Sequence, residues 1–134
     1  MSIKELNRLC KGTFIERLNI EFTGYTDTTL EAIMHVTPDL FQPMGVVHGG
    51  AFISLAETVG SAGSFLRVDP EHYVVLGSSV NSQHLATAKE GVLYAIGTLV
   101  VLSDFKHVWD VEIKDGKGKL ISISRVTNSV KPRK

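Results

Sequence analysis

The segment from Leu40 to Leu66 constrains the fold more than any other part of the chain. Its 27 residues carry one formal charge, Glu57, although 21% of the chain is charged and about six charges would be expected. The stretch from His48 onward is long enough to span a membrane, but a charge at its centre would cost several kcal/mol in lipid. We therefore expect a buried helix of a soluble protein from His48 to about Leu66, with Glu57 buried in it and no membrane partner.

The rest of the sequence predicts one short helix and six strands. Ser2 and Glu5 have the spacing of a capping box at the start of a helix that ends near Gly12. Alternation of apolar and polar residues predicts strands over residues 18–23, 30–36, 73–82, 92–102, 106–114 and 119–127. The 92–102 segment is apolar on both faces, as expected of a central strand. The pattern predicts an α+β fold, with one long helix against an antiparallel sheet.

Length and charge narrow the class of protein. A chain of 134 residues favours a single domain, residues 1–134. Lys and Arg number 14 and Asp and Glu number 14, which disfavours a nucleic-acid partner. All the acids lie at or before Asp115, and six cations follow between Lys117 and Lys134. These cations are a candidate contact for a polyanionic ligand, although a solvated tail is the simpler interpretation of residues 131–134.

Cysteine and histidine are too sparse for a disulfide or a metal site. Cys10 is the only cysteine, and it has no ligand-like spacing to His35 or His72. The first five residues contain no apolar signal core. We expect no bound metal and a cytoplasmic location.

The predicted helix has two unlike sides at 100° per residue. Beside Glu57 lie mostly small residues: Gly50, Ile53, Ser54, Gly60, Ser61 and Ser64. The opposite side is bulky and suits a sheet: Phe52, Leu55, Val59, Ala62 and Leu66. The small side leaves room for another helix or for a ligand next to the carboxylate. A buried ionised Glu57 needs a hydrogen-bond or charge partner, or else a catalytic role. The simpler alternative to catalysis is a hydrogen bond from Ser54 or Ser61, or an ion pair with a surface Arg.

Polar and glycine residues surround the start of this helix. Gly49 and Gly50 leave backbone N–H groups free to polarise a carbonyl, and glycine lets a substrate approach the backbone closely. Together with Gln42, His48 and Glu57 they are the parts of an acyl-transfer site. Taken alone, His48 is as consistent with a structural role as with a catalytic one.

Helix geometry separates two of these parts. Gly49 and Glu57 are eight residues apart, about 12 Å along the helix axis. A carbonyl donor and an attacking carboxylate must each lie about 3 Å from the reacting group, so one helix can hardly supply both. If both act on one bond, they come from two chains with antiparallel helices. The spacing therefore predicts a dimer.

Three short stretches, residues 47–51, 55–57 and 60–61, resemble the hotdog-fold acyl-CoA thioesterases of the PaaI-like superfamily. With Gln42 in front, they are similar to the branch that contains 4-hydroxybenzoyl-CoA thioesterase and the 1,4-dihydroxy-2-naphthoyl-CoA hydrolase of menaquinone synthesis. The resemblance covers most of the chain, including Asn81, His84 and residues 107–115. It implies an antiparallel sheet wrapped around a long central helix, and hydrolysis of an acyl-CoA, with an aromatic acyl group, to free acid and CoA.

The resemblance also implies roles for five residues. Glu57 would attack the thioester carbonyl or activate a water, and Ser61 would position that water or the carboxylate. The N–H of Gly49 would polarise the carbonyl with Gln42 nearby, while His48 would orient the site or assist the leaving thiolate. Glu57 would come from one subunit and the other groups from its neighbour, in dimers that pair into homotetramers. No metal or redox cofactor is implied, because CoA is part of the substrate.

Substrate contacts are implied at Met44, Asn81, Ser64, His84, Ser103 and Lys106. The naphthoyl-CoA relatives tend to have Phe where Met44 stands, which leaves the shape of the acyl pocket open. Ser103 and Lys106 belong to a segment that replaces a Gly-Ser-Arg-like sequence at the nucleotide end of CoA. Asp104 within it is unfavourable beside phosphates, so Lys106 would compensate or the contacts would move.

Two other functions compete with this hypothesis. A hotdog hydratase or dehydratase uses a His and an acid in other motif contexts, and a non-catalytic acyl-CoA-binding module would not need Glu57 at the helix centre. The sequence leaves open the acyl group, the choice between nucleophile and general base for Glu57, and the arrangement of subunits.

Overall fold

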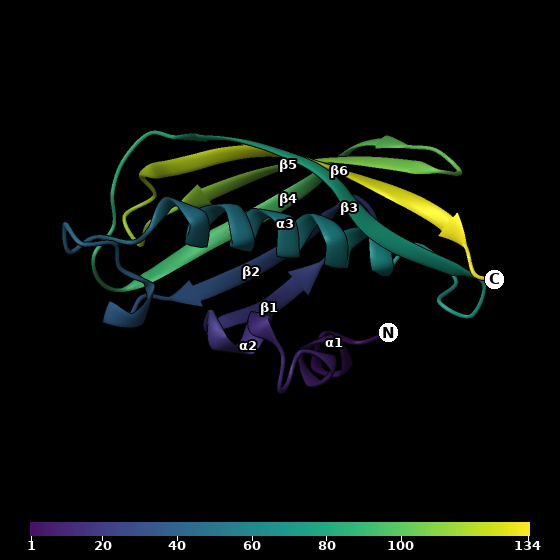
Figure 1. Ribbon diagram of the computed structural model, residues 1–134, viewed down its shortest axis with the longest axis horizontal. Coiled ribbons are helices and arrows are strands. Elements are labelled where there is room, and N and C mark those ends of the chain that lie inside the picture. Colours follow the sequence, from purple (N-terminus) through teal and green to yellow (C-terminus); the bar gives the residue numbers. More distant parts are fainter.

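The computed structural model describes all 134 residues, and its main feature is a curved sheet that wraps around one long helix (Figure 1). The elements follow in the order α1 (Ile3–Leu9), α2 (Phe14–Arg17), β1 (Ile20–Tyr25), β2 (Thr29–His35), a 3-10 turn η1 (Pro38–Leu40), α3 (Gly49–Phe65), β3 (Tyr73–His84), β4 (Val92–Leu102), β5 (Lys106–Lys114) and β6 (Leu120–Pro132). No helix is both long and apolar enough to cross a membrane. The expected α+β architecture is confirmed.

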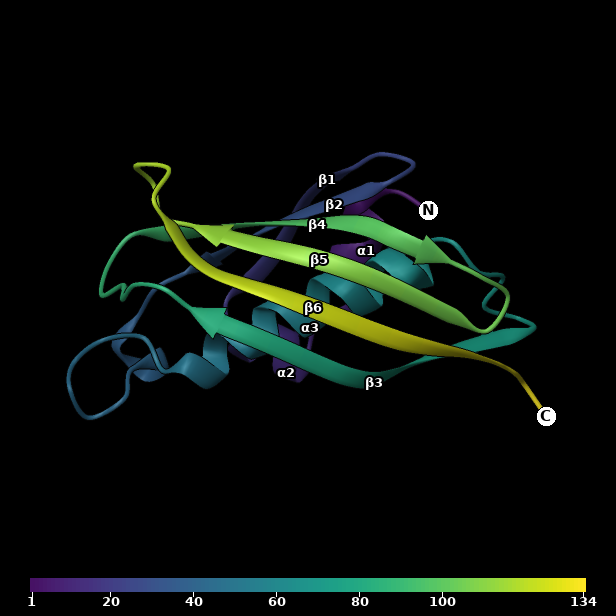
Figure 2. The same ribbon diagram turned by 90° about the horizontal axis from the view of Figure 1, so that it is seen from above.

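The sheet has six strands in the order β1-β2-β4-β5-β6-β3, and every neighbouring pair is antiparallel. Figure 2 shows β3, β6, β5 and β4 side by side, with α3 behind them and crossing their direction obliquely. The strand β4 is interior, as its two apolar faces predict. The strands β1 and β3 are the edges, and β3 is bulged between Gly77 and Ser79.

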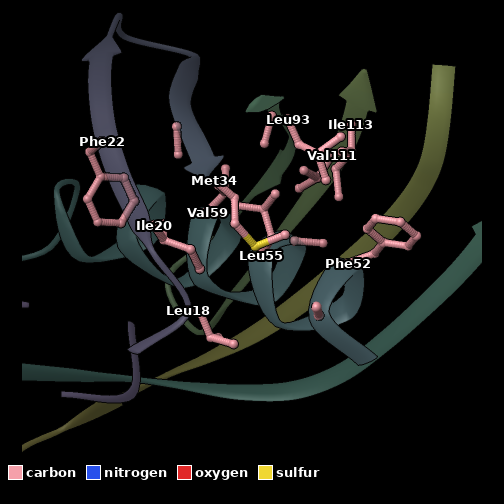
Figure 3. Packing of buried hydrophobic residues seen from close by; sticks show 14 of the residues in the cluster. Leu18, Ile20, Phe22, Met34, Phe52, Leu55, Val59, Leu93, Val111 and Ile113 are labelled. Carbon is pink, nitrogen blue, oxygen red and sulfur yellow. The ribbon is translucent and has the colours of Figure 1, made fainter. Parts of the chain in front are cut away.

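The core lies between α3 and the concave face of the sheet (Figure 3). Leu55 and Val59 on the helix are fully buried, and they meet inward residues of the strands such as Met34, Leu93 and Val111. Alternation along β4 and β5 directs every second side chain toward the helix. The bulky side of α3 therefore packs on the sheet, as expected.

Part of the small-residue side of α3 also packs on the sheet, contrary to the expectation that another helix or a ligand would lie there. A Cβ on Gly60 would lie 2.8 Å from Val126, and Ser64 is fully buried. Next to this side, a Cβ on Gly63 would lie 2.6 Å from the Trp109 ring. The strands cross the helix obliquely, so they cover Gly60 and Ser64 on this side. Ile53, Glu57 and Ser61 stay open to a cavity.

Boundaries differ from the sequence prediction at both ends of the chain. The expected strand over residues 18–23 begins later, at Ile20, because a short helix, α2, occupies Phe14–Arg17 and Asn19 adopts a left-handed φ of 58°. The last strand continues to Pro132, five residues beyond the expected end, because it pairs with β3 as far as Tyr73. The basic C-terminal segment is thus partly strand.

Candidate active site

The start of α3 presents one unpaired backbone donor. His48 is the N-cap, and its Nδ1 accepts a hydrogen bond from the N–H of Gly50 at 2.8 Å. The N–H of Gly49, first in the helix, donates to no group of the chain. It lies at the positive end of a 17-residue helix dipole. A polarised carbonyl would find a donor here.

His84 lies at the same end of the helix, although it follows Gly49 by 35 positions in the sequence. A Cβ on Gly49 would lie 3.1 Å from His84 Nε2, so a larger residue at position 49 would require the imidazole to move by a few tenths of an ångström. Ser122 Oγ donates to the carbonyl of Gln83 and therefore accepts from His84 Nδ1, at 2.8 Å. The neutral His84 ring then carries its lone pair on Nε2, beside Gly49.

Glu57 lies two turns further along α3 and is exposed in the single chain. The expectation of a buried Glu57 is therefore wrong for one chain. Glu57 lies beside Gly77 of β3, where a Cβ would lie 3.1 Å from Glu57 Oε2, so the strand has no side chain there to cover the carboxylate. Neither serine supplies the alternative hydrogen bond: Ser54 Oγ donates to the carbonyl of Gly50, and Ser61 has no partner. No basic side chain pairs with Glu57.

The carboxylate of Glu57 faces a cavity of about 630 Å³. Thirteen of its 18 lining residues are hydrophobic. One wall is α3, including Ile53, Ser54, Ser61 and Phe65; a second is β3 from Tyr73 to Leu76. A third wall comes from the N-terminal helices: Leu6, Leu9, Cys10, Phe14 and Ile15. A carboxylate beside a serine hydroxyl and an apolar hollow is suited to reaction with an apolar acyl group.

The N-terminal wall is the part of the site that sequence reasoning missed. Ile3, Leu6 and Leu9 showed an apolar helical face, but nothing in the sequence indicated what it would cover. Cys10 lies in this wall, donates its thiol hydrogen to the carbonyl of Leu6, and has its pKa raised by burial. Arg133, one of the C-terminal cations considered for a polyanionic ligand, also lines this cavity.

Gln42 and Met44 lie in the loop that connects η1 to α3. The loop is closed by a bridge between Phe41 and Val47, and Gln42 Oε1 accepts a hydrogen bond from the N–H of Met44. Met44 is 82% exposed. Neither residue lines the Glu57 cavity. The loop joins the Gly49 end of the helix.

Ser64 and Asn81 do not line the Glu57 cavity either. Ser64 is fully buried, where it accepts from Trp109 Nε1 and Asn128 Nδ2 and therefore donates to His107 Nδ1. Asn81 lies on the outer face of the sheet, opposite Arg125 of β6. Their substrate contacts stay predictions.

Ser103 and Lys106 close the turn between β4 and β5. Ser103 Oγ accepts from the N–H of Lys106 at 3.1 Å and donates to its carbonyl at 3.0 Å. Lys106 pairs with Ser129 of β6, so Lys131 follows on the adjacent strand. Two lysines therefore lie at this end of the sheet, next to a turn that also contains Asp104.

Comparison with known proteins assigns the family. The Thioesterase superfamily model matches residues 44–122. The 1,4-dihydroxy-2-naphthoyl-CoA hydrolase of Escherichia coli is 36% identical, over 97% of this chain and 95% of its own. A thioesterase variant from Pseudomonas aeruginosa superposes with a TM-score of 0.96 at 34% identity, covering 99% of this chain and 96% of that one. A thioesterase variant from Staphylococcus aureus superposes at 0.87 with 34% identity, over 89% of this chain and 98% of that one.

The chain belongs to the Thioesterase superfamily. It is a hotdog-fold enzyme that hydrolyses thioesters, and the expected fold and enzyme class are confirmed.

Proposed function

We propose that the protein hydrolyses acyl-CoA thioesters to the free acid and CoA, with Glu57 as the group that acts on the thioester carbon. The observation that carries this proposal is an exposed, unpaired carboxylate at the side of an apolar cavity. The acyl group would occupy the cavity. The resemblance to hydroxybenzoyl- and dihydroxynaphthoyl-CoA hydrolases makes an aromatic acyl group the first candidate.

The site is completed by a second copy of the chain. Gly49 and Glu57 lie about 12 Å apart along α3, too far to act on one carbonyl. In a homodimer with antiparallel helices, Gly49, His48 and Gln42 of one copy meet Glu57 and Ser61 of the other. The exposed edge strand β3 and the open side of α3 support this arrangement. Pairing of such dimers into a homotetramer is a further expectation.

The chemistry follows from these positions. The Gly49 N–H holds the thioester oxygen as negative charge develops on it, aided by the helix dipole. The Glu57 carboxylate either attacks the carbon to form an anhydride, or removes a proton from a water that attacks. In both routes the carbon–sulfur bond breaks and CoA leaves as the thiolate. In the first route a water then cleaves the anhydride, which releases the free acid and restores the Glu57 carboxylate. His48 Nδ1 is engaged with Gly50, so its Nε2 is the nitrogen available to the leaving sulfur.

A shared spacing supports the roles of Gln42 and Glu57. The Staphylococcus aureus protein was solved in two variant forms, one with a Gln and one with a Glu replaced by alanine, fifteen positions apart. Gln42 and Glu57 are separated by the same fifteen positions.

The CoA nucleotide would bind outside the cavity, where Lys106 and Lys131 supply positive charge to its phosphates. Ser103 would contribute a hydroxyl at the turn, while Asn81 and His84 would contact the rest of the substrate. The reaction needs no metal or redox cofactor, and the cytoplasm supplies acyl-CoA.

The experiment is a CoA-release assay with a panel of aryl- and fatty-acyl-CoAs. Glu57→Ala is expected to lose at least about a thousandfold in kcat while still binding substrate. Glu31→Ala is the matched control, because Glu31 is also an exposed carboxylate beside a strand glycine. Unchanged turnover by Glu57→Ala would reject the mechanism, and binding without CoA release by the unmodified protein would indicate a binding module.

Mixed dimers test the shared site. A Glu57→Ala copy and a Gln42→Ala copy are each expected to be inactive alone. Refolded together, they form mixed dimers in which one of the two sites carries neither substitution, so about a quarter of the original activity should return. No recovery would place the whole site within one chain.

A further inference from the structure

We infer that the N-terminal helices α1 and α2 select the acyl group, with Phe14 and Leu9 as specificity-determining residues for an uncharged apolar acyl group longer than one aromatic ring. This inference rests on the proposed function, because it assigns the Glu57 cavity to the acyl group. It goes beyond that function by naming the residues that determine the accepted length of the acyl group, and the chemistry of that group.

The first observation is the length of the cavity. Ile53, Glu57, Ser61 and Phe65 lie four residues apart along its α3 wall, so the wall runs for about 18 Å. From Glu57 to Phe65 it extends about 12 Å. An extended chain advances about 1.3 Å per carbon, so this length accepts about eight to ten carbons. A single ring next to Glu57 would leave most of it empty.

The second observation is the chemistry of the lining. Between Glu57 and the far end, the walls are apolar apart from small hydroxyls, and a charged acyl group would lose its hydration there without a partner. The one cation in the lining is Arg133, at the far end. Its Nε donates to the carbonyl of Pro70 at 2.7 Å, and its backbone N–H donates to the carbonyl of His72. These two hydrogen bonds hold Arg133 against the backbone of Pro70 and His72.

The third observation is that large apolar side chains of the N-terminal wall face solvent in the free chain. Phe14 is 67% exposed and Leu9 is 58% exposed, yet both line the cavity. An acyl group along α3 would bury part of both side chains. That burial would favour long groups over short ones.

The fourth observation is that α1, the part of this wall that carries Leu9, is fixed in place. Asn7 of α1 donates from Nδ2 to the carbonyl of Phe22 at 2.9 Å and accepts from its N–H at 2.8 Å, like an added strand residue on the edge of β1. The Tyr25 hydroxyl donates to the carbonyl of Met1. A wall held by these bonds can discriminate by length, because it does not collapse onto a shorter group.

Two chemical sources fit this description: a bicyclic aromatic acyl group and a linear chain of eight to ten carbons. The assay therefore compares kcat/KM for acetyl-, benzoyl-, 1-hydroxy-2-naphthoyl-, octanoyl- and decanoyl-CoA. The expected result is that the naphthoyl or the octanoyl and decanoyl substrates exceed benzoyl by at least tenfold. The long substrate whose kcat/KM exceeds that of benzoyl-CoA shows which of the two acyl groups the cavity accepts. A kcat/KM for benzoyl-CoA equal to those for the naphthoyl and the linear substrates overturns the inference and leaves the proposed function intact.

The variants Phe14→Ala and Leu9→Ala test the residues. Each is expected to lower kcat/KM for the preferred long substrate about five- to tenfold while changing acetyl-CoA less than twofold. Both side chains are largely exposed, so loss of the fold is not expected. Tyr94→Ala is the matched control, since Tyr94 is a half-exposed aromatic residue on the outer face of β4.

Three other outcomes reject the assignment. An equal loss on every substrate would make the N-terminal wall a structural support only. An unchanged profile in both variants would remove Phe14 and Leu9 from the acyl site. A change in oligomeric state by sedimentation, with an unchanged profile, would show that a second copy of the chain covers this wall. No CoA release by the unmodified protein from any substrate would instead reject the proposed function.

Discussion

The Glu57 carboxylate lies against the backbone of Gly77 across the gap between α3 and the edge strand β3. A Cβ on Gly77 would lie 3.1 Å from Glu57 Oε2, closer than most such contacts. A larger residue at position 77 would therefore displace the carboxylate by a few tenths of an ångström. This contact sets where the carboxylate lies relative to the cavity beside it.

Gly77→Ala should shift the Glu57 carboxylate by a few tenths of an ångström and lower kcat about tenfold. The matched control is Gly24→Ala on the opposite edge strand β1. A Cβ there would lie at an ordinary 3.7 Å from Glu31 Oε2. Steady-state kinetics and thermal unfolding of both variants are the measurements. A Gly77→Ala protein with unchanged kcat would show that the carboxylate position is not set by β3.

The two serines Ser61 and Ser64 should respond differently to alanine. Ser64→Ala leaves the buried His107 Nδ1 and Trp109 Nε1 without a partner and removes one of the two acceptors of Asn128 Nδ2, so it should lower the free energy of unfolding by about 3 kcal/mol. Ser61→Ala removes a hydroxyl with no partner in the chain, and it should lower kcat with little loss of stability. Chemical denaturation and kinetics separate the two effects. The reverse pattern would place Ser64 in the substrate site.

The close approach of α3 to the sheet predicts a strong effect of Gly63→Ala. Its Cβ would lie 2.6 Å from the fully buried Trp109 ring, so ring or helix must shift at a cost of about 1–3 kcal/mol. Gly116→Ala is the control, because a Cβ there meets nothing within 4 Å. It should change the unfolding free energy by less than about 0.5 kcal/mol. Equal effects would contradict the packing described for this face.

Buried His107 should make stability depend on pH. Burial, and to a lesser extent the nearby Arg67 guanidinium, lowers its pKa below the ordinary 6.5. The unfolded chain therefore binds a proton more readily than the folded chain as pH falls below 6.5, and stability declines from there until the lower folded pKa is reached. Above 6.5 this contribution is constant. His107→Gln, which keeps an acceptor for Ser64, should abolish this part of the slope in denaturation measured across pH.

Carboxylates contribute in a lower pH range. The pKa of Asp110 is lowered by its hydrogen bond from Arg125, and that of Asp115 by the N–H groups of Lys119 and Lys117. Their stabilisation is present above the ordinary carboxyl pKa and is lost as pH falls through the lowered values. A decline confined to this acidic range in the unmodified protein would contradict the assignment to His107.

Asn7→Ala should destabilise the N-terminal wall of the cavity without changing any residue that lines it. It removes two hydrogen bonds to Phe22, for an expected loss of about 1–2 kcal/mol in unfolding free energy. The ratio of kcat/KM for decanoyl- over acetyl-CoA should also fall. Asn7→Asp keeps the acceptor for the Phe22 N–H, so its ratio of kcat/KM should fall less than that of Asn7→Ala. A stability loss with an unchanged ratio would limit Asn7 to holding the fold.

Much of the architecture follows from local pattern. The limits of α3, Gly49–Phe65, agree with the expected 48–66 because the cap, the absence of charge and the helical apolar repeat all coincide there. The strands β4 and β5 begin and end where alternation predicts. The proposal that one chain does not complete the site needs only the helical rise between Gly49 and Glu57.

Contacts between distant segments could not be obtained in this way. Ser64 lies seven residues from Glu57 and so on the same ideal helix side, yet it is fully buried while Glu57 is exposed. Periodicity assigns residues to a side of the helix, but the oblique crossing of the strands decides how far that side is covered.

The sequence by itself determined the fold class, the long helix with its single charge, and the candidate site residues on and around that helix, since these depend on spacing of a few residues. Only the tertiary structure decided that Gly77 leaves Glu57 open, that His84 reaches Gly49, and that α1 and α2 wall the cavity. Each of these contacts joins segments at least 20 residues apart in the chain. Their meeting depends on strand order and on the packing of the whole core, which no local pattern specifies.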